Sequence, residues 1–151
     1  MIVVSVINQQ GDVPVSTVQM VKVARCALRR LRIRSRGTFV IAFIGSRRMR
    51  ALNKRFLRHD RVTDVLSFRY EGEPVVGEIL IAPHRARAYA ARHGIPYREE
   101  LARYVVHGLL HWLGHEDETA AQQRRMRAME DALLTKLKSP ITKSQSPNNH
   151  Q

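Results

Sequence analysis

The sequence predicts a single α+β domain, layered from helices and strands, with a roughly four-stranded mixed sheet and about five helices. Three observations support this class. The chain has 151 residues, which is the length of one ordinary domain. Stretches with strand and helix periodicity are interleaved along it, and no repeat or shift in composition marks a second domain. We expect the domain to occupy residues 1–138 and the polar residues 139–151, which lack apolar periodicity, to form a disordered tail.

The first half of the chain begins with a short β-branched run over residues 2–7, which predicts a strand. Ser16 and Gln19 then have the spacing of a capping box, and the apolar residues after them recur at helical spacing, so we expect a helix of about five turns. Residues 38–44 are apolar throughout, which is typical of an interior strand covered on both faces. A short helix is expected to follow from Ser46.

The second half begins with a predicted β-hairpin formed by residues 63–70 and 75–82, separated by a turn that contains glycine and proline. A proline at the first position and a glycine just beyond the end predict a helix over residues 83–93. Two further helices are expected, the first over residues 97–114 and the second, amphipathic, over residues 119–138.

The charge of the chain is strongly unbalanced, with 26 Lys and Arg against 13 Asp and Glu, a formal net charge of +13. Such an excess attracts polyanions, because each neutralised phosphate releases condensed counterions. Nucleic acid is therefore the first partner to consider. The alternative explanation is a generally basic surface that has no such partner. The densest basic patch supplies the candidates for contact with RNA, which are Arg47, Arg48, Arg50, Arg55 and Arg61. The basic residues of the helical segment at 22–36 are an alternative RNA-facing surface, or simply a solvated face of that helix.

The expected compartment is the cytoplasm. The one cysteine, Cys26, cannot form an intramolecular disulfide, which fits a reducing environment. No apolar run is long enough to span a bilayer, and the first residues lack the basic start of a signal peptide. We therefore expect a soluble cytoplasmic protein without a membrane partner.

Two histidines, His107 and His111, lie four residues apart in an apolar run. On a helix they share one face about one turn apart, so both rings can face one metal ion, whereas unpaired imidazoles would be costly to bury there. A zinc ion needs a third protein ligand from another direction, because a helix cannot wrap around it. Gly114 allows the chain to reverse, so that Asp117 or His115 becomes that ligand and water takes the fourth position.

Gly108 follows the first histidine directly. Zinc proteases carry at this position the glutamate that acts as general base for the attacking water. Peptide hydrolysis by that route therefore has no base here, and a metalloprotease-like hydrolase is disfavoured.

Residues 107–117 resemble the signature of the YbeY family. Members of this family are single-strand-specific endoribonucleases whose motif is His-Gly-x-Leu-His-x-x-Gly-x-x-His. The residues that match in place are His107, Gly108, Leu110, His111 and Gly114. The last position, normally histidine, is Asp117, which is also a competent zinc ligand. Two other segments resemble the family: Leu-Asn followed by Thr-Asp-Val-Leu-Ser-Phe within residues 52–68, and Gly-Glu-Ile over residues 77–79, where the family has Gly-Asp-Ile.

The resemblance implies a metal-dependent endoribonuclease that acts on single-stranded RNA. Its expected role is maturation of ribosomal RNA, at the 3′ end of the small-subunit RNA, and ribosome quality control. The implied partners are ribosomal RNA and the small ribosomal subunit, with no specificity for DNA. The implied cofactor is one zinc ion per chain, held by His107, His111 and Asp117.

The resemblance also points to catalytic residues. Family members usually carry an arginine five residues after the leucine of Leu-Asn, where this chain has Leu57, and the adjacent Arg58 is our candidate for its role. Asp64 and Glu78 lie in the other matching segments and are candidates for the general base. A second function stays open, that of a ribosome-associated RNA-binding protein with a mainly structural metal and weak or no nuclease activity. The departures at Leu57 and Asp117 favour it.

Overall fold

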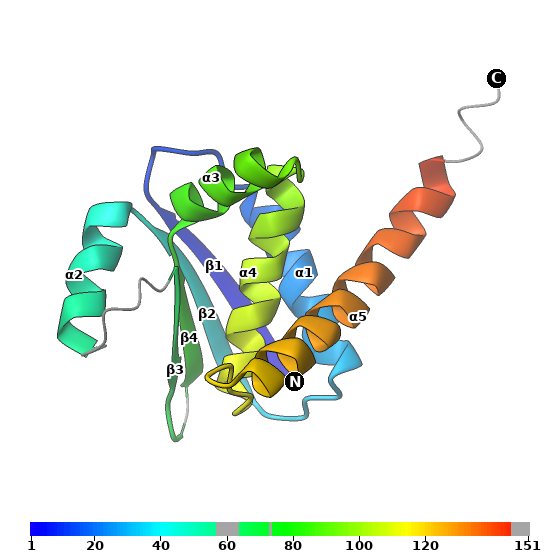
Figure 1. Ribbon diagram of the computed structural model, residues 1–151. Coiled ribbons are helices and arrows are strands. Elements are labelled where there is room, and N and C mark those ends of the chain that lie inside the picture. Colours follow the sequence, from blue (N-terminus) through cyan, green and yellow to red (C-terminus); the bar gives the residue numbers. More distant parts are fainter. Residues whose placement is uncertain (57–63, 73, 146–151) are drawn as a thin grey trace.

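The protein is described by a computed structural model that covers residues 1–56, 64–72 and 74–145, with side chains as far as residue 135. This part of the chain forms four strands and five helices (Figure 1). They are β1 (Ile2–Gln9), α1 (Thr17–Arg30), β2 (Gly37–Ile44), α2 (Ser46–Phe56), β3 (Val65–Arg69), β4 (Val75–Ile81), α3 (Pro83–His93), α4 (Tyr97–Trp112) and α5 (Ala120–Gln145).

The four strands form one mixed sheet in the order β1-β2-β4-β3. Strand β2 pairs in parallel with β1 and with β4, so that Ile41 lies opposite Val6 and Ile79. Strand β3 is antiparallel to β4 and pairs Ser67 with Ile79. The predicted α+β class, the four-stranded mixed sheet and the hairpin are all confirmed.

The main core lies between one face of this sheet and the helices α1 and α4. Because side chains alternate across a strand, Phe39, Ile41 and Phe43 all point to this face, and each is fully buried. Helix α4 contacts the sheet and the helices α1, α3 and α5 (Figure 1). The burial of its second half explains why residues 105–112 are apolar apart from the two histidines.

The opposite face of the sheet is covered in part by α2. Met49 of α2 packs on Ala42, Ile44 and Leu80, which alternate with the residues of the main core. Strand β2 is therefore covered on both faces towards its C-terminal end, as its unbroken apolar sequence predicts.

Gly108 lets α4 lie close to the sheet. A Cβ atom at this position would stand 2.8 Å from the Ile79 side chain and 3.1 Å from that of Val65, closer than packed carbon atoms come. The Gly108 carbonyl also accepts a hydrogen bond of 2.7 Å from the Ser67 hydroxyl of β3. The close contact of the Gly108 backbone with the Ile79 and Val65 side chains and the hydrogen bond from Ser67 together set the position of α4 along the sheet.

The predicted ends of two helices differ from the structure. Helix α1 begins with the expected cap, in which Ser16 Oγ accepts a hydrogen bond of 3.3 Å from the Gln19 amide, but it ends at Arg30, before five turns are complete. Helix α5 continues to Gln145, beyond the boundary expected after residue 138. The division into a domain and a disordered tail stays a prediction. No helix in the part of the chain described is long and apolar enough to cross a membrane.

Candidate metal centre

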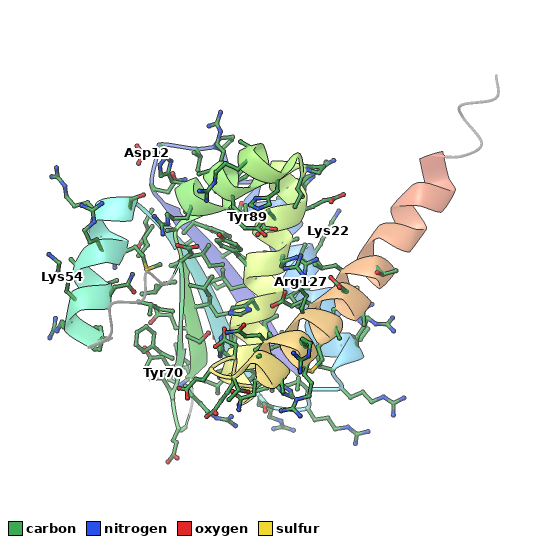
Figure 2. All side chains as sticks on the ribbon, in the orientation of Figure 1. Asp12, Lys22, Lys54, Tyr70, Tyr89 and Arg127 are labelled. Carbon is green, nitrogen blue, oxygen red and sulfur yellow. The ribbon has the colours of Figure 1, made fainter. Side chains whose placement is uncertain are left out.

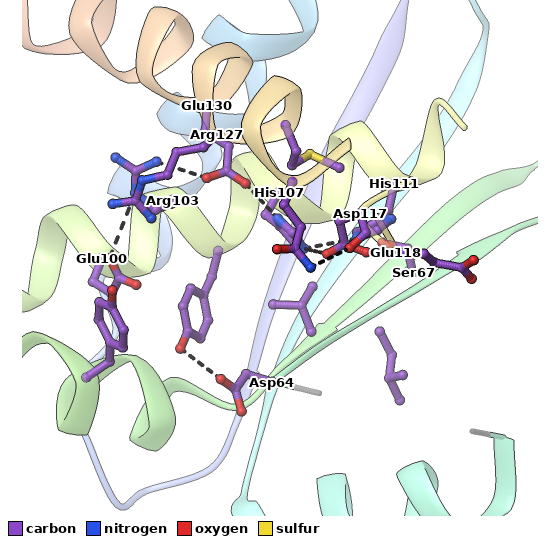
Figure 3. A pocket seen from close by; sticks show the side chains of 16 residues that line it. Asp64, Ser67, Glu100, Arg103, His107, His111, Asp117, Glu118, Arg127 and Glu130 are labelled. Carbon is purple, nitrogen blue, oxygen red and sulfur yellow. Dashed lines mark hydrogen bonds and ion pairs between the residues drawn. The ribbon is translucent and has the colours of Figure 1, made fainter. Parts of the chain in front are cut away.

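Helix α4 carries one polar stripe on an otherwise buried surface. Glu100, Tyr104, His107 and His111 recur at spacings of three and four residues, so they share one face of the helix. This face lines a cleft of about 830 Å³, together with residues of α3, α5 and the start of β3 (Figure 3). The stripe therefore brings titratable groups to a cleft that solvent can enter.

The chain turns back sharply after α4. Gly114 has a φ of +98°, a conformation that glycine adopts without strain. The Gly114 amide donates to the His111 carbonyl at 2.9 Å, and the His115 amide donates to the Leu110 carbonyl at 3.0 Å. These bonds satisfy carbonyl groups at the end of the helix and direct the chain back towards its last turn. The predicted reversal at Gly114 is confirmed.

Three potential ligand atoms converge where the chain returns. His107 Nε2 lies 3.0 Å from His111 Nε2, and each of these atoms lies 3.4 Å from Asp117 Oδ2. Ligands about 2.0–2.1 Å from a tetrahedral zinc ion stand about 3.3–3.4 Å apart. The three side chains are each less than one-third exposed and line the cleft. These three residues could therefore hold one metal ion at the cleft.

The sequence left two candidates for the third ligand. Among the residues described, the group that could hold a metal consists of His107, His111 and Asp117. His115 is exposed to solvent and uses its backbone amide to close the helix. The geometry of the turn therefore brings the Asp117 carboxylate, rather than the His115 ring, to the two histidines.

Glu130 of α5 holds His107 from the side away from this group (Figure 3). Its Oε2 lies 2.6 Å from His107 Nδ1, and the residue is only 5% exposed. Arg103 donates to Glu130 Oε1 at 2.9 Å, which offsets the cost of burying the carboxylate. When Nδ1 carries the ring proton and donates to Glu130, the lone pair of Nε2 is free for a metal.

The environment of His111 keeps its ring neutral at neutral pH. Burial lowers the pKa of the imidazole below its ordinary value of 6.5, and the neighbouring His107 lowers it further, while Asp117 acts in the opposite direction. A histidine must be unprotonated to bind a metal. The site therefore presents His111 in the form that a ligand needs.

Asp64 lies in the same cleft as the histidines. Its Oδ1 accepts a hydrogen bond of 2.7 Å from Arg85 Nε, and its Oδ2 accepts one of 3.0 Å from the Tyr104 hydroxyl. Burial, followed by the charge of Asp64, raises the pKa of Tyr104, so the phenol stays protonated and donates. One candidate for the general base thus lines the same cleft as the ligand group and has a defined orientation.

Glu78, the other candidate, points away from the cleft. A Cβ atom on the preceding residue, Gly77, would lie 2.5 Å from Trp112 of α4, so Glu78 projects from the opposite face of the sheet. There its Oε1 accepts a hydrogen bond of 2.9 Å from the Tyr70 hydroxyl. The structure does not bring Glu78 together with the histidines.

The predicted RNA contacts also lie apart from the cleft. The four described arginines of this set are exposed on α2, which covers the sheet face opposite α4. Arg48 donates to Gln9 Oε1 at 2.6 Å, and the guanidinium of Arg55 lies 5.4 Å from the centre of the Phe56 ring. Arg58, Arg61 and Leu57 lie outside the residues described.

Sequence reasoning missed several residues of the cleft, of which Glu130 is the most important. It falls four residues after Met126 and four before Leu134, both buried core residues of α5. A glutamate at a core-facing helical position was the signal that could have found it, because carboxylates are seldom buried without a partner. Tyr104 could similarly have been found from its helical spacing to His107 and His111.

The comparisons with known proteins identify one family. The sequence model described as Endoribonuclease YbeY matches residues 5–138. The endoribonuclease YbeY of Flavobacterium psychrophilum is 36% identical over 102 residues, 67% of this chain and 73% of the relative. That of Chlorobaculum tepidum is 36% identical over 103 residues, 68% of this chain and 75% of the relative.

One solved structure resembles the fold of this chain. A Thermotoga maritima protein whose structure was solved in solution superposes with a TM-score of 0.58, covering 91% of this chain and 93% of its own, at 20% identity. This likeness concerns the fold alone. The family assignment follows from the sequence matches, which extend through all the elements that build the cleft. The chain belongs to the Endoribonuclease YbeY family.

Proposed function

We propose that this protein is a metal-dependent endoribonuclease that cuts single-stranded RNA during the maturation of ribosomal RNA. The observation that carries the proposal is the convergence of three ligand atoms at tetrahedral spacing, on an open cleft, in a member of the YbeY family. The proposed cofactor is one zinc ion per chain. The proposed setting is the cytoplasm, with RNA of the small ribosomal subunit as substrate and ribosome quality control as a related role.

The ligand set suits chemistry on a phosphodiester. When bound, a zinc ion supplies a Lewis acid that polarises a phosphoryl oxygen and lowers the pKa of bound water. With two histidines and one carboxylate as ligands, a bound zinc ion would keep a net positive charge, which attracts the substrate phosphate. Glu130 keeps the proton of His107 on Nδ1, and the turn at Gly114 holds Asp117 in place.

Other residues have separate tasks in the proposal. Asp64 is the described candidate for accepting a proton from the attacking nucleophile, and its two hydrogen bonds orient the carboxylate towards the cleft. Arg58 remains our candidate for stabilising charge on the phosphate. Arginines of α2 would hold RNA that extends beyond the cleft. Glu78 projects from the other face of the sheet, so Asp64 is the stronger candidate for the base.

Metal content and RNA cleavage test the proposal together. We expect His111→Ala and Asp117→Ala to lose bound zinc and to reduce cleavage of a single-stranded RNA by roughly 100-fold or more, because the electrostatic stabilisation is lost. His84→Ala is the matched control, since this histidine is exposed and does not line the cleft. Zinc is measured by mass spectrometry, cleavage with a labelled RNA. Unchanged cleavage by His111→Ala would overturn the proposal.

The same measurements separate the enzyme from an RNA-binding protein with a structural metal. The aspartate at the third ligand position, where the family signature has histidine, is the observation that favours this second function. In that case the wild type binds RNA and zinc but does not cleave, and zinc removal lowers only its thermal stability. A protease remains disfavoured. A glutamate side chain at Gly108 would meet Ile79 and Val65 of the sheet instead of reaching the ion.

A further inference from the structure

The positive charge of the chain is concentrated in one region. Half of the 26 Lys and Arg, and none of the 13 Asp and Glu, lie between Asp12 and Asp60. Seven of these basic residues are on α1 and the segment that follows it, and all seven are exposed. This α1 surface consists of Lys22, Arg25, Arg29, Arg30, Arg32, Arg34 and Arg36.

The α1 surface is separate from both sites considered above. None of its residues lines the cleft, and none forms an ion pair with any residue that the structure describes. In Figure 2, Lys22 marks this side of the molecule and Lys54 of α2 marks the opposite side. Because these exposed cations form no ion pair with a described acidic residue, their charge favours an anionic partner.

Arg32 occupies a backbone conformation that does not suit it. Its φ of 55° makes it the one non-glycine residue with positive φ in the part of the chain described. It follows the helix cap Leu31, and the Ile33 amide donates to the Leu28 carbonyl at 3.1 Å, so Arg32 takes the position where helix ends usually have glycine or asparagine. A strained cation amid exposed cations indicates that the charge itself is used.

The segment after α1 is also anchored so that its arginines face solvent. Leu31 and Ile33 are partly buried against the main core. The residues that alternate with them, Arg30, Arg32 and Arg34, are exposed. Packing of the apolar residues reduces the entropy that the arginines would lose on binding a ligand.

The composition of the α1 surface favours phosphate groups of a double helix. Six of the seven residues are arginine, whose planar fork pairs with phosphate oxygens. Residues 17–36 contain no aromatic side chain on which the bases of a single strand could stack, whereas the cleft has Tyr89 and Tyr104. The apolar face of α1 is buried in the core and cannot insert into a lipid surface.

We propose that the α1 surface binds the phosphate backbone of double-helical RNA next to the single strand that enters the cleft. Recognition of this kind reads the shape and backbone of an RNA helix and not its base sequence. The arrangement of duplex beside cleaved strand rests on the endoribonuclease function proposed above. The binding of duplex RNA does not depend on that function.

Two triple variants of equal charge test the surface. Arg29→Gln/Arg34→Gln/Arg36→Gln removes three cations from it, and Arg87→Gln/Arg92→Gln/Arg98→Gln removes three exposed cations elsewhere. With a blunt RNA duplex as probe, we expect the first to bind roughly 10-fold more weakly, with a salt dependence of log affinity flatter by about one unit per lost contact. The second should change affinity less than about 2-fold. Equal effects would overturn the proposal.

Cleavage separates this proposal from the proposed function. The substrates are a hairpin with a single-stranded tail and the tail alone. We expect the wild type to cleave the hairpin substrate more efficiently, and the α1 variant to lose only this advantage, with an unchanged kcat/KM on the tail. If the wild type cleaves neither RNA while the α1 variant still loses duplex affinity, the proposed nuclease function is wrong. The proposal that the α1 surface binds duplex RNA is then supported. Binding of anionic vesicles or an acidic polypeptide in place of duplex RNA would refute it.

The variant Arg32→Gly tests whether the charge of Arg32 contributes to RNA binding or whether residue 32 has only a structural role. Glycine relieves the left-handed backbone conformation, so we expect Tm to rise by about 2–4 °C. Duplex affinity should nevertheless fall, because one phosphate contact is lost. A purely structural role for residue 32 predicts a higher Tm with unchanged duplex affinity, and that result would remove Arg32 from the α1 surface.

Discussion

Glu130 determines how the ring of His107 is presented to a metal. A histidine has two nitrogen atoms, and the hydrogen bond made by one decides which of them is free to act as ligand. Here the bond of 2.6 Å to Glu130 engages Nδ1, while Nε2 faces His111 and Asp117. Because Glu130 belongs to α5, this contact couples the last helix to chemistry on α4.

Replacement of Glu130 should therefore weaken metal binding. We expect Glu130→Gln to lower zinc affinity by about 10–100-fold, since an amide fixes the ring less strongly than a carboxylate does. Zinc affinity is measured by competition with a chromophoric chelator. Asp131→Asn is the matched control, because this exposed carboxylate also pairs with Arg103, at 2.7 Å, but does not touch His107. Equal losses in both variants would assign the effect to Arg103 instead.

At the scale of elements, the position of α4 on the sheet depends on small residues. Gly108 and Gly77 lie on the facing surfaces of α4 and β4, and a Cβ atom on either would overlap side chains of the main core. The close approach places both histidines above β3, where the Ser67 hydroxyl bonds to the helix. The glycine that excludes protease chemistry thus also allows the fold to pack.

Gly108→Ala should destabilise the fold despite the better helix propensity of alanine. Propensity favours alanine by about 1 kcal/mol, whereas overpacking a filled core costs about 1–3 kcal/mol. Because the atoms that the methyl group meets belong to the fully buried Ile79, we expect the free energy of unfolding to fall by about 1 kcal/mol. Urea denaturation measures it. Gly11→Ala, which has open space around it, should change stability far less.

The stability of the whole molecule should depend on the titration of Glu100. Burial raises the pKa of this carboxyl, and Arg103 and Arg127 lower it in part. The folded state therefore binds the proton more tightly than the unfolded chain, whose pKa is near 4.5. This contribution to stability is complete below pH 4.5 and is lost as the pH rises through the raised pKa.

Glu100→Gln removes this titration, because the amide stays neutral at every pH. We expect the difference in free energy of unfolding, variant minus wild type, to rise as the pH increases from 4.5 towards neutral. Denaturation in a series of buffers measures the difference. Glu71→Gln, at an exposed position, serves as control. A difference that stays constant with pH would show that Glu100 titrates alike in the folded and unfolded states.

In the folded molecule, charged residues that contribute to the net charge of the sequence lie on three separate surfaces. The cleft and its ligand group lie on the α4 side of the sheet, with acidic as well as basic groups. The predicted contacts on α2 lie on the other side, and the α1 surface is distinct from both. A count of charges cannot reveal this division, since it depends on which helix covers which face.

Features that depend on local spacing could be predicted from the amino-acid sequence. Periodicity predicted the four strands, the five helices and the mixed sheet, and the separation of four residues placed His107 and His111 on one face of a helix. These features follow from backbone geometry, which is the same in every helix and strand.

The contacts between distant segments could not be predicted in this way, because they depend on the folded chain. The tertiary structure brought Asp117 instead of His115 to the histidines, through the turn at Gly114. It placed Glu130 behind His107 and turned Glu78 to the far face of the sheet. In each case the outcome depends on the packing of one element against another, because a shift of one residue in a strand or turn reverses where a side chain points.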